Sequence, residues 1–520
     1  MKKATRARVF VVAAGPEIEH KFLFAENDLP KVTALIASQA RTKTSHRLKA
    51  IYFDTPRHDL WNHGFTLRVR KTGTSYRQGI KRIVSSSITR DEWEEPVNGP
   101  APDLENIKIT PLARLKGKSA IARSLLPVFE VEAERASYSL DTMAGLIEGS
   151  IDRGAIKANG ATLGVYEVEL ELKSGTVSGL LNLARNFVSQ ANLYPSTISK
   201  AERGYLLAEG AFGRAAKGSR PRLVATMPCQ QAFQEICRTC LHDFQLNVPA
   251  MAHIAETEGV HQGRVAIRRL RAAMALFKPL IFDISYRRLN SELKWLGGLL
   301  GAGRDLDVLQ ERLVQRAASD EASSWEAEVL NRIEARRLQA RHAAIESLES
   351  ERGRTLLIDL LEWIESGPWQ GQFNQKMEAP ICAFARVRLK KRLAKLVTRK
   401  EDLARLDADA RHKIRIEAKK LRYMAEFFVS IRGVAKQKEQ YKLMINCCKT
   451  LQEAIGAIRD EEARAEFMQS DSWPEMGVGN RISDADFLHP IPGLPLQAGT
   501  TKNLRKAVKA YSKLSTINPF

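Results

Sequence analysis

The sequence lacks a long hydrophobic run and contains few cysteines. No apolar stretch approaches the roughly 18 residues that a transmembrane helix requires, so we expect no membrane span. The six cysteines all lie beyond residue 228, and their spacing is not that of a disulfide framework. Cys237 and Cys240 form a single C-x-x-C pair, which favours packed thiols over a zinc site. These features favour a cytoplasmic protein.

Acidic residues are also in deficit. The chain has 81 Lys and Arg against 60 Asp and Glu, a net charge of +21 and a pI near 9.7. Such an excess predicts an anionic partner, for example nucleic acid, polyphosphate or an acidic membrane surface. The larger share of the excess lies beyond residue 210. A chain of 520 residues is too long for one core, so two or three domains are expected.

The pattern of apolar residues changes about two fifths of the way along the chain. Residues 8–210 mix helical patterns near 29–40 and 178–192 with strand-like segments. These segments lie at 48–53, 66–70, 129–134, 150–157 and 166–173. Residues 211–224 resemble a linker, and residues 225–515 are almost wholly helical in pattern. The predicted fold class is therefore α+β, with a mixed domain followed by an all-α domain.

Glu17-x-Glu19-x-Lys21 is the first of several charged alternations. Strand side chains alternate between faces, so these three side chains share one face. Two carboxylates suit a hard divalent cation, and a neighbouring lysine suits a phosphate that the cation bridges. Taken alone, the motif fits a solvated edge strand at least as well, because short motifs often match by accident.

Other predicted strands repeat this alternation with one charged and one apolar face. The repeated charges are Arg68 and Arg70; Glu130, Glu132 and Glu134; and Glu167, Glu169 and Glu171. A closed sheet could collect such faces inside a polar lumen while its apolar faces are covered outside. Acidic rows would then hold a metal ion, and basic rows would hold phosphates. The local pattern is evenly balanced between this arrangement and half-exposed strands.

In order along the chain, these strands resemble the CYTH domains of the triphosphate tunnel metalloenzymes. The matching motifs are Glu17-x-Glu19-x-Lys21, Tyr52-Phe-Asp54-Thr-Pro, Leu67-Arg68-Val-Arg70, Lys81, Arg90-x-Glu92, Glu130-x-Glu132, Arg135, Asp152-x-Gly154, Glu167-x-Glu169-x-Glu171-Leu-Lys173 and Ser199-Lys200-Ala-Glu-Arg203-Gly-Tyr205. The resemblance implies an eight-stranded antiparallel tunnel. Such a tunnel binds a linear triphosphate with Mg²⁺ or Mn²⁺ and hydrolyses a phosphoanhydride bond.

The resemblance also implies roles for individual residues. The implied metal ligands are Glu17, Glu19, Asp152, Glu169 and Glu171, and the implied triphosphate ligands are Lys21, Arg68, Arg70, Lys81, Arg135 and Lys200. Glu17, Glu19 and Lys21 are the implied catalytic residues. We expect His20 to pack or lie at the surface, and His58 and His63 to be surface residues in a turn.

The expected activity is that of an inorganic triphosphatase. Two alternatives stay open. One is a non-catalytic protein that binds polyphosphate or targets polyphosphate granules. The other is a tunnel enzyme that acts on ATP or thiamine triphosphate.

The helical part contains an internal repeat. His261-Gln-Gly-Arg264-Val-Ala-Ile-Arg268-Arg269-Leu-Arg271 matches His412-Lys-Ile-Arg415-Ile-Glu-Ala-Lys419-Lys420-Leu-Arg422. At about 100° per residue, the first copy places His261, Arg264, Arg268 and Arg271 within an arc of about 80°. His412, Arg415, Lys419 and Arg422 do the same in the second copy. We call these two sets the basic stripes.

A basic stripe opposite an apolar one is usually a solvated helix face. Its duplication, without carboxylates in between, favours a polyanion as ligand. The absence of stacking aromatic residues favours polyphosphate over nucleic acid.

The helical part resembles the CHAD domain. The shared motifs are the two repeats, Gly303-Arg304-Asp305-Leu-Asp307-Val308, and a second echo at residues 451–460 in which Arg459 replaces a common Asn. The resemblance implies two four-helix bundles related by pseudo-symmetry and a basic groove that binds polyphosphate. We expect residues 451–460 to form a loop. Asp305 and Asp307 are expected to cap a helix or hold arginines.

Overall fold

The structure is a computed structural model of the 520-residue chain. It describes residues 17–83, 89–104, 118–142, 145–252, 257–317, 324–370, 375–397, 403, 406–431, 435–468 and 499–517. The chain divides into two compact units, which are described separately. The first unit comprises Met1–Lys217, Leu241–Ile267 and Ser291–Pro368. The second comprises Gly218–Cys240, Arg268–Asn290 and Trp369–Phe520.

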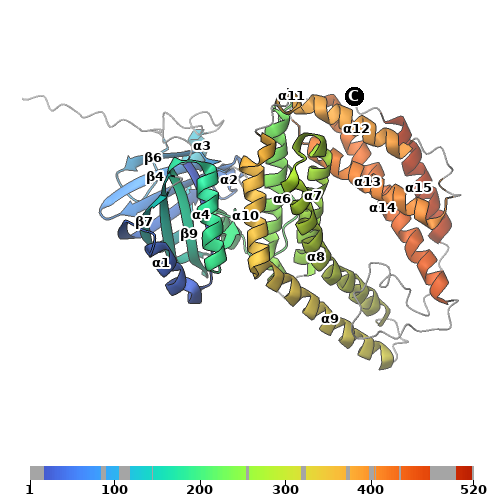
Figure 1. The fold of residues 1–520 in the computed structure, drawn as a ribbon, viewed down its shortest axis with the longest axis horizontal. Coiled ribbons are helices and arrows are strands. Elements are labelled where there is room, and N and C mark those ends of the chain that lie inside the picture. Colours follow the sequence, from blue (N-terminus) through green and yellow to red (C-terminus); the bar gives the residue numbers. More distant parts are fainter. Residues whose placement is uncertain are drawn as a thin grey trace, which may run out of the picture. The chain divides into compact units, whose positions relative to one another are not determined.

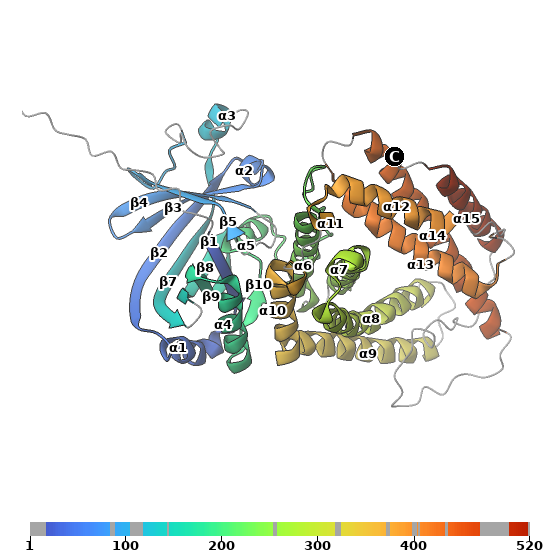
Figure 2. The same ribbon diagram turned by 45° about the horizontal axis from the view of Figure 1, so that its top comes forward.

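The strands of the first unit form one antiparallel sheet (Figure 2). They are β1 (Glu17–Leu23), β2 (Thr42–Asp54), β3 (Phe65–Thr72), β4 (Ser75–Arg82), β5 (Thr89–Arg90), β6 (Glu92–Val97), β7 (Leu126–Thr142), β8 (Gly145–Ala158), β9 (Ala161–Gly175) and β10 (Tyr194–Ser196). The order is β10-β1-β9-β8-β7-β2-β3-β4-β6, and β5 pairs with β1. The segments called strands in the sequence analysis lie in β2, β3, β7, β8 and β9.

The sheet closes on itself through β5 and β6. These two strands follow one another along the chain, separated only by Asp91. β6 pairs with β4, whereas β5 pairs with β1 at the start of the sheet. If β5 and β6 are counted as one interrupted strand, eight strands surround the interior, and short β10 adds to β1. The predicted eight-stranded antiparallel tunnel is therefore confirmed.

Helices cover the outside of the tunnel. They are α1 (Leu29–Ala37), which follows the short 3-10 turn η1 (Glu26–Asp28), and α2 (Asp59–Asn62), α3 (Lys118–Arg123) and α4 (Val177–Gln190). α5 (Lys200–Ala208) lies on the inner face instead, because Ala201 and Tyr205 share a core cluster with the inward-facing Tyr52 and Val131. Val168 and Leu170 of β9 are fully buried in a core cluster with Leu180 and Phe187 of α4. The glutamates that alternate with them consequently point inward. This arrangement is the predicted inversion of a small barrel, with an apolar outside and a charged interior.

Beyond residue 228 the described part of the chain is mostly helical, as predicted. The helices are α6 (Cys229–Ala252), α7 (Thr257–Ile281), α8 (Ile284–Ala317), α9 (Ser324–Glu349), α10 (Glu351–Ser366), η3 (Pro368–Gln370), α11 (Gln375–Glu378), α12 (Ile381–Val397), α13 (Ala408–Phe428), α14 (Ala435–Met468) and α15 (Gly499–Thr516) (Figure 1). In the second unit α12 contacts α13 and α15, and α14 contacts the same two helices. These four helices therefore close into a four-helix bundle. The pseudo-symmetry of two bundles stays a prediction.

The first unit extends beyond the sheet domain. α10 packs against α4 and β10, and Ile358 of α10 is fully buried in the same core cluster as β9 (Figures 1 and 2). The Arg185 guanidinium on α4 also lies 2.6 Å from the Asp359 carboxylate. Residues 211–224 contain no helix or strand. The domain boundaries predicted from the sequence stay a prediction.

Several smaller expectations concern thiols and membranes. All six cysteines are free, and Cys237 and Cys240 are buried on α6, as packed thiols should be. Within the described residues, no helix combines the length and the apolar character needed to cross a membrane.

Candidate functional site

The interior of the tunnel contains a cavity of about 350 Å³ lined by charges of both signs. Every predicted triphosphate ligand lines it: Lys21, Arg68, Arg70, Lys81, Arg135 and Lys200. So do Glu19, Asp152, Glu169 and Glu171 from the predicted metal ligands. The side chain of Glu17 lies outside the described part of the structure, although its backbone pairs with Arg90. The strand alternation seen in the sequence thus brings these side chains to one cavity.

Three carboxylates form a tight cluster on β8 and β9. One oxygen each from Asp152, Glu167 and Glu169 lies within 4.8 Å of the other two. Asp152 and Glu167 are fully buried. Glu19 of β1 lies opposite Glu171 of β9 in the strand register, and both line the cavity outside this cluster. Oxygen donors in such a group could hold a hard divalent cation.

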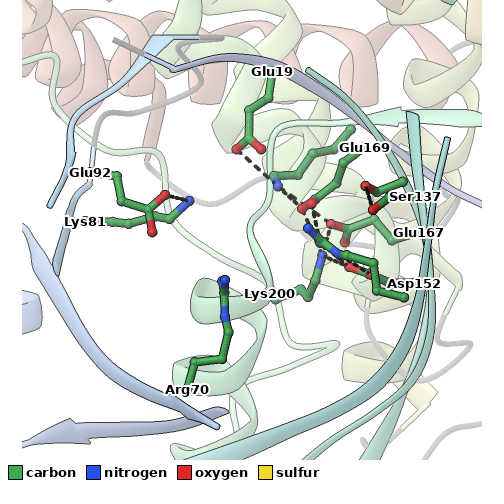
Figure 3. A network of polar contacts seen from close by, with 12 residues as sticks. Glu19, Arg70, Lys81, Glu92, Ser137, Asp152, Glu167, Glu169 and Lys200 are labelled. Carbon is green, nitrogen blue, oxygen red and sulfur yellow. Dashed lines mark hydrogen bonds and ion pairs between the residues drawn. The ribbon is translucent and has the colours of Figure 1, made fainter. Parts of the chain in front are cut away.

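Cations contact the same carboxylates (Figure 3). The guanidinium of Arg135 donates Nε and Nη2 hydrogen bonds of 2.7 Å each to the two Asp152 oxygens. The Lys200 ammonium lies 2.8 Å from Asp152 and 2.9 Å from Glu169. Lys21 also bonds Glu169 and lies 3.2 Å from the Glu19 carboxylate. The acidic cluster is therefore enclosed by three of the predicted phosphate ligands.

These cations keep the buried carboxylates ionised. Burial alone would raise the pKa values of Asp152 and Glu169, because a charge loses hydration inside the protein. The charges of Lys200 and Arg135 outweigh burial and hold both pKa values below their ordinary range, and Lys21 adds to the effect on Glu169. The pKa of Lys200 is raised in turn by the same carboxylates, against the lowering effect of burial.

A second ionic group lies on β3, β4 and β6. The Arg68 guanidinium is 2.7 Å from Glu92 and 2.9 Å from Glu94, and the Lys81 ammonium is 2.6 Å from Glu92. Burial would raise the pKa of Glu92, but the charges of Arg68 and Lys81 lower it below its ordinary value. These predicted phosphate ligands are thus charged and held in place.

Arg70 is less well compensated than Arg68. Its guanidinium lies 3.7 Å from Glu94, beyond hydrogen-bond distance. The charge of Arg68, followed by burial, lowers the pKa of Arg70 to about 10. In Figure 3 Arg70 projects into the space between the two ionic groups. This part of the cavity has a deficit of negative charge, which an anionic ligand would relieve.

Several acidic residues of the site were not assigned a role from the sequence, and two of them are central to its ionic groups. Glu167 belongs to the acidic cluster and Glu92 to the second ionic group. Both residues could have been identified from the sequence. Glu167 alternates in phase with Glu169 and Glu171 on β9, and Glu92 was part of a quoted motif without a role.

One expectation about the acidic rows was wrong. Glu132 does not face the lumen, because it contacts Lys49 at 2.8 Å and Lys157 at 2.7 Å on the exposed side of the sheet. Glu130 also contacts Lys49, and Glu134 contacts Arg153. The residues of β7 that line the cavity are Val131, Ala133 and Arg135, in the opposite phase of the strand. Because Arg135 faces inward, the alternation alone excludes Glu130, Glu132 and Glu134.

The histidines behave as expected. His20 is buried and packs edge-on against Phe22, with ring centroids 4.6 Å apart. His58 contacts the exposed Glu209 at 2.9 Å, beside α2. His63 follows α2 and bonds the Asp59 carbonyl. The cavity lining contains none of the three.

The basic stripes of the helical part lie on α7 and α13, and their members are half-buried. The first arginine of each stripe contacts a backbone carbonyl of another helix. Arg264 reaches the Gly301 oxygen on α8, and Arg415 reaches the Gln452 oxygen on α14, each at 3.3 Å. The sequence repeat is therefore also a repeat of contacts. Arg422 departs from the pattern, because it pairs with Glu426 at 2.7 Å.

The remaining motif residues need one correction. Residues 451–460 do not form a loop, because they lie inside the continuous helix α14. Asp307 lies inside α8, where it holds the Arg337 guanidinium at 3.6 Å and does not cap a helix. The side chains of Arg304, Asp305 and Arg459 fall outside the described residues.

Comparisons with known proteins find relatives of the N-terminal part and of most of the chain. The chain is 30% identical over 169 residues to an inorganic triphosphatase of Haemophilus influenzae, and this match covers 31% of the chain and 46% of the relative. The chain thus spans less than half the length of that relative. It is 27% identical over 440 residues to an uncharacterised protein of Mycobacterium tuberculosis, with coverage of 79% and 82%.

A solved structure and two family matches complete the comparison. The crystal structure of the CHAD domain from the plant Ricinus communis is 24% identical, with a TM-score of 0.42 and coverage of 58% of this chain and 97% of that one. Residues 15–205 match the CYTH domain, and residues 235–469 match the CHAD domain. The chain therefore contains a CYTH domain followed by a CHAD domain.

Proposed function

We propose that the CYTH domain hydrolyses inorganic triphosphate with a divalent metal ion, and that the CHAD domain binds polyphosphate. The observation that carries the first part is the charged cavity, in which a carboxylate cluster and several cations face one lumen. Its volume of about 350 Å³ lies within the range of about 300–1,000 Å³ typical of small-molecule sites.

The cations suit a linear chain of phosphates. Lys21, Arg135 and Lys200 surround the acidic cluster, whereas Arg68, Arg70 and Lys81 belong to the strands β3 and β4. An elongated anion could contact both groups. The carboxylate partner of Arg70, Glu94, lies 3.7 Å away, beyond hydrogen-bond distance. Arginine and lysine are the usual phosphate ligands of proteins, and here they already line the cavity.

The carboxylates suit a metal ion. Asp152, Glu167 and Glu169 offer only oxygen donors, which fits Mg²⁺ or Mn²⁺ better than a softer ion. When bound, such an ion would offset the negative charge of the phosphate oxygens. The carboxylates of the cluster are paired with Lys21, Lys200 and Arg135. When a metal ion binds the carboxylates, these three cations could pair with a phosphate chain instead. We therefore propose Asp152, Glu167 and Glu169 as metal ligands, together with Glu19 and Glu171, which line the same cavity. Glu17 stays in this proposal from the sequence alone.

We propose that the catalytic residues Glu17, Glu19 and Lys21 lie on β1. Glu19 and Lys21 are both buried, and they lie 3.2 Å apart at the edge of the acidic cluster. A carboxylate and an ammonium in this position can orient water and stabilise charge on a leaving phosphate oxygen. Glu17 precedes them on the same strand.

The second part of the proposal rests on the basic stripes. Each stripe combines a histidine with three cations on one helix, and all of these side chains are half-buried. A flexible polyanion can contact such a row without recognition of any base. We therefore propose His261, Arg264, Arg268, Arg271, His412, Arg415, Lys419 and Arg422 as polyphosphate ligands.

One assay tests the enzymatic proposal. Phosphate release by the full-length chain is measured on tripolyphosphate, ATP and thiamine triphosphate, each with Mg²⁺, with Mn²⁺ and with a chelator. We expect release from tripolyphosphate that needs a metal ion and exceeds release from the two organic substrates. Preferential release from ATP or thiamine triphosphate would assign the tunnel to an organic triphosphate. Polyphosphate binding without any hydrolysis would support the alternative of a non-catalytic binding protein.

A further inference from the structure

Helix α6, which begins the helical part of the chain, reaches the tunnel cavity. His242 of α6 lines the cavity, and its side chain is 12% exposed. Its Nε2 lies 2.8 Å from the Glu202 carboxylate, and its Nδ1 lies 3.3 Å from the Thr197 hydroxyl. Both contacts are made within the first compact unit.

Gln245, almost one turn further along α6, makes three hydrogen bonds to the same segment. Its side-chain oxygen accepts from the Thr197 backbone amide at 2.7 Å and from the Thr197 hydroxyl at 2.6 Å. Its amide nitrogen donates to the Pro195 carbonyl at 2.9 Å. Gln245 is 3% exposed, so these bonds are shielded from water.

The segment held in this way carries Lys200. Ser199 caps α5 by accepting a 3.1 Å hydrogen bond from the Glu202 amide, and Lys200 is the first residue of the helix. Thr197 before Lys200 and Glu202 after it are both held by α6. Lys200 itself reaches the acidic cluster through Asp152 and Glu169. The position of its ammonium therefore depends on where α6 holds residues 197–202.

We propose that His242 and Gln245 are positioning residues of the tunnel site. They act through the Thr197–Glu202 segment on Lys200, so that the affinity of the tunnel for its substrate depends on a helix of the CHAD domain. This inference rests on the proposed function of the tunnel, but it concerns different residues. In this proposal α6 helps to position the residues of the tunnel site, in addition to its place at the start of the helical part of the chain.

A double-mutant cycle on the full-length chain tests this inference. Steady-state kcat and KM for tripolyphosphate are measured for the wild type, His242→Ala, Lys200→Ala and the double variant. Because a hydrogen bond to a charged group contributes about 1.5–3 kcal/mol, we expect His242→Ala to raise KM at least about tenfold. In the Lys200→Ala background the same substitution should change KM less than about twofold, because its effect passes through Lys200.

Two further variants separate positioning from loss of fold. His242→Gln keeps a polar side chain within reach of Glu202 and should recover most of the affinity. Thr239→Ala alters the same helix at a buried residue whose hydroxyl bonds only within α6, to the Glu235 carbonyl at 2.8 Å, and it should leave KM unchanged. Thermal unfolding of every variant is the control for stability. If His242→Ala fails to fold, Gln245→Ala takes its place in the cycle.

The outcomes distinguish this inference from the proposed function. Unchanged KM in His242→Ala, with an active wild type, overturns the inference and leaves the function in place. If the two single substitutions raise KM by factors that multiply in the double variant, His242 acts on the substrate independently of Lys200. This result would also overturn the positioning role. If the wild type releases no phosphate, the proposed function fails. The cycle is then measured as tripolyphosphate affinity by calorimetry, with the same expected non-additivity.

Discussion

In the CYTH domain the cations face buried carboxylates across a cavity, whereas in the CHAD domain they follow one face of a helix. Arg135 and Lys200 are fixed by Asp152 and Glu169 at 2.5–2.9 Å. Arg264 and Arg415, in contrast, contact backbone carbonyls at 3.3 Å. Charges of both signs in one cavity suit an anion together with a metal ion. Charge of one sign suits an anion alone, so the two domains should differ in their need for metal.

The largest expected effect concerns the carboxylate cluster. Glu169→Gln removes one proposed metal ligand without changing the size of the side chain. We expect it to lower tripolyphosphate hydrolysis by about a thousandfold, because the charge of the bound ion would no longer be held in place. The assay is phosphate release at saturating Mg²⁺.

The matched control for Glu169→Gln is Glu132→Gln. Glu132 also pairs with two cations, Lys49 and Lys157, but on the outer face of β7. We expect near wild-type hydrolysis from this variant. Equal losses in the two variants would show that general electrostatics, and not the cluster, controls activity. Polyphosphate binding by the CHAD domain should be unchanged in both.

The second effect concerns the basic stripes. The double variant Arg264→Glu, Arg415→Glu reverses one cation in each copy, and we expect polyphosphate affinity to fall about a hundredfold at low salt. Calorimetry with long-chain polyphosphate and a chelator present measures it. Arg505→Glu, Lys509→Glu on α15 makes the same change of net charge at exposed positions and serves as control. If both double variants lose affinity equally, net charge accounts for the binding and the stripes do not.

The third effect is on stability and depends on pH. Asp152 has a folded pKa below its ordinary value, so its ion pairs stabilise the protein at neutral pH. That contribution is lost as the pH falls through the depressed folded pKa. We expect Asp152→Asn to lower the free energy of unfolding by about 2 kcal/mol at pH 7. The difference from the wild type should shrink in urea titrations at increasingly acidic pH, and a constant difference would refute the ionic origin.

The smallest effect distinguishes two neighbouring arginines. The charge of Arg68 repels that of Arg70, and the carboxylate partner of Arg70, Glu94, lies beyond hydrogen-bond distance. Arg70→Gln should therefore raise the free energy of unfolding of the ligand-free protein by about 1 kcal/mol. The same substitution should weaken tripolyphosphate binding. Arg68→Gln breaks the pairs with Glu92 and Glu94 and should destabilise the protein. Thermal unfolding with and without tripolyphosphate checks both, and a destabilising Arg70→Gln would contradict the deficit of negative charge.

Much of the tunnel could be predicted because strand alternation is a local property. The spacing of Glu167, Glu169 and Glu171 on β9 is sufficient to place them on one face, and the apolar residues between them pack outside. The phase of β7 was equally readable from Arg135, yet Glu130, Glu132 and Glu134 were placed on the wrong side. These glutamates lie an odd number of residues from Arg135, so they face the opposite side of the strand.

Other features could not be predicted because they join distant parts of the chain. Closure of the sheet depends on a break at Asp91 that lets β5 and β6 pair with different strands. The contact of His242 with Glu202 depends on how α6 packs against β10 and α5, which no local pattern encodes. Residues 451–460 were taken for a loop although no proline interrupts them, and they continue α14.

The most direct test of the difference between the domains is phosphate release from tripolyphosphate by the Arg264→Glu, Arg415→Glu variant, with Mg²⁺ and with a chelator. We predict wild-type release with Mg²⁺, no release with the chelator, and loss of long-chain polyphosphate binding in both conditions. Release that persists without a metal ion would contradict the proposed role of the metal in the tunnel. Release that disappears together with polyphosphate binding would contradict the assignment of two separate sites.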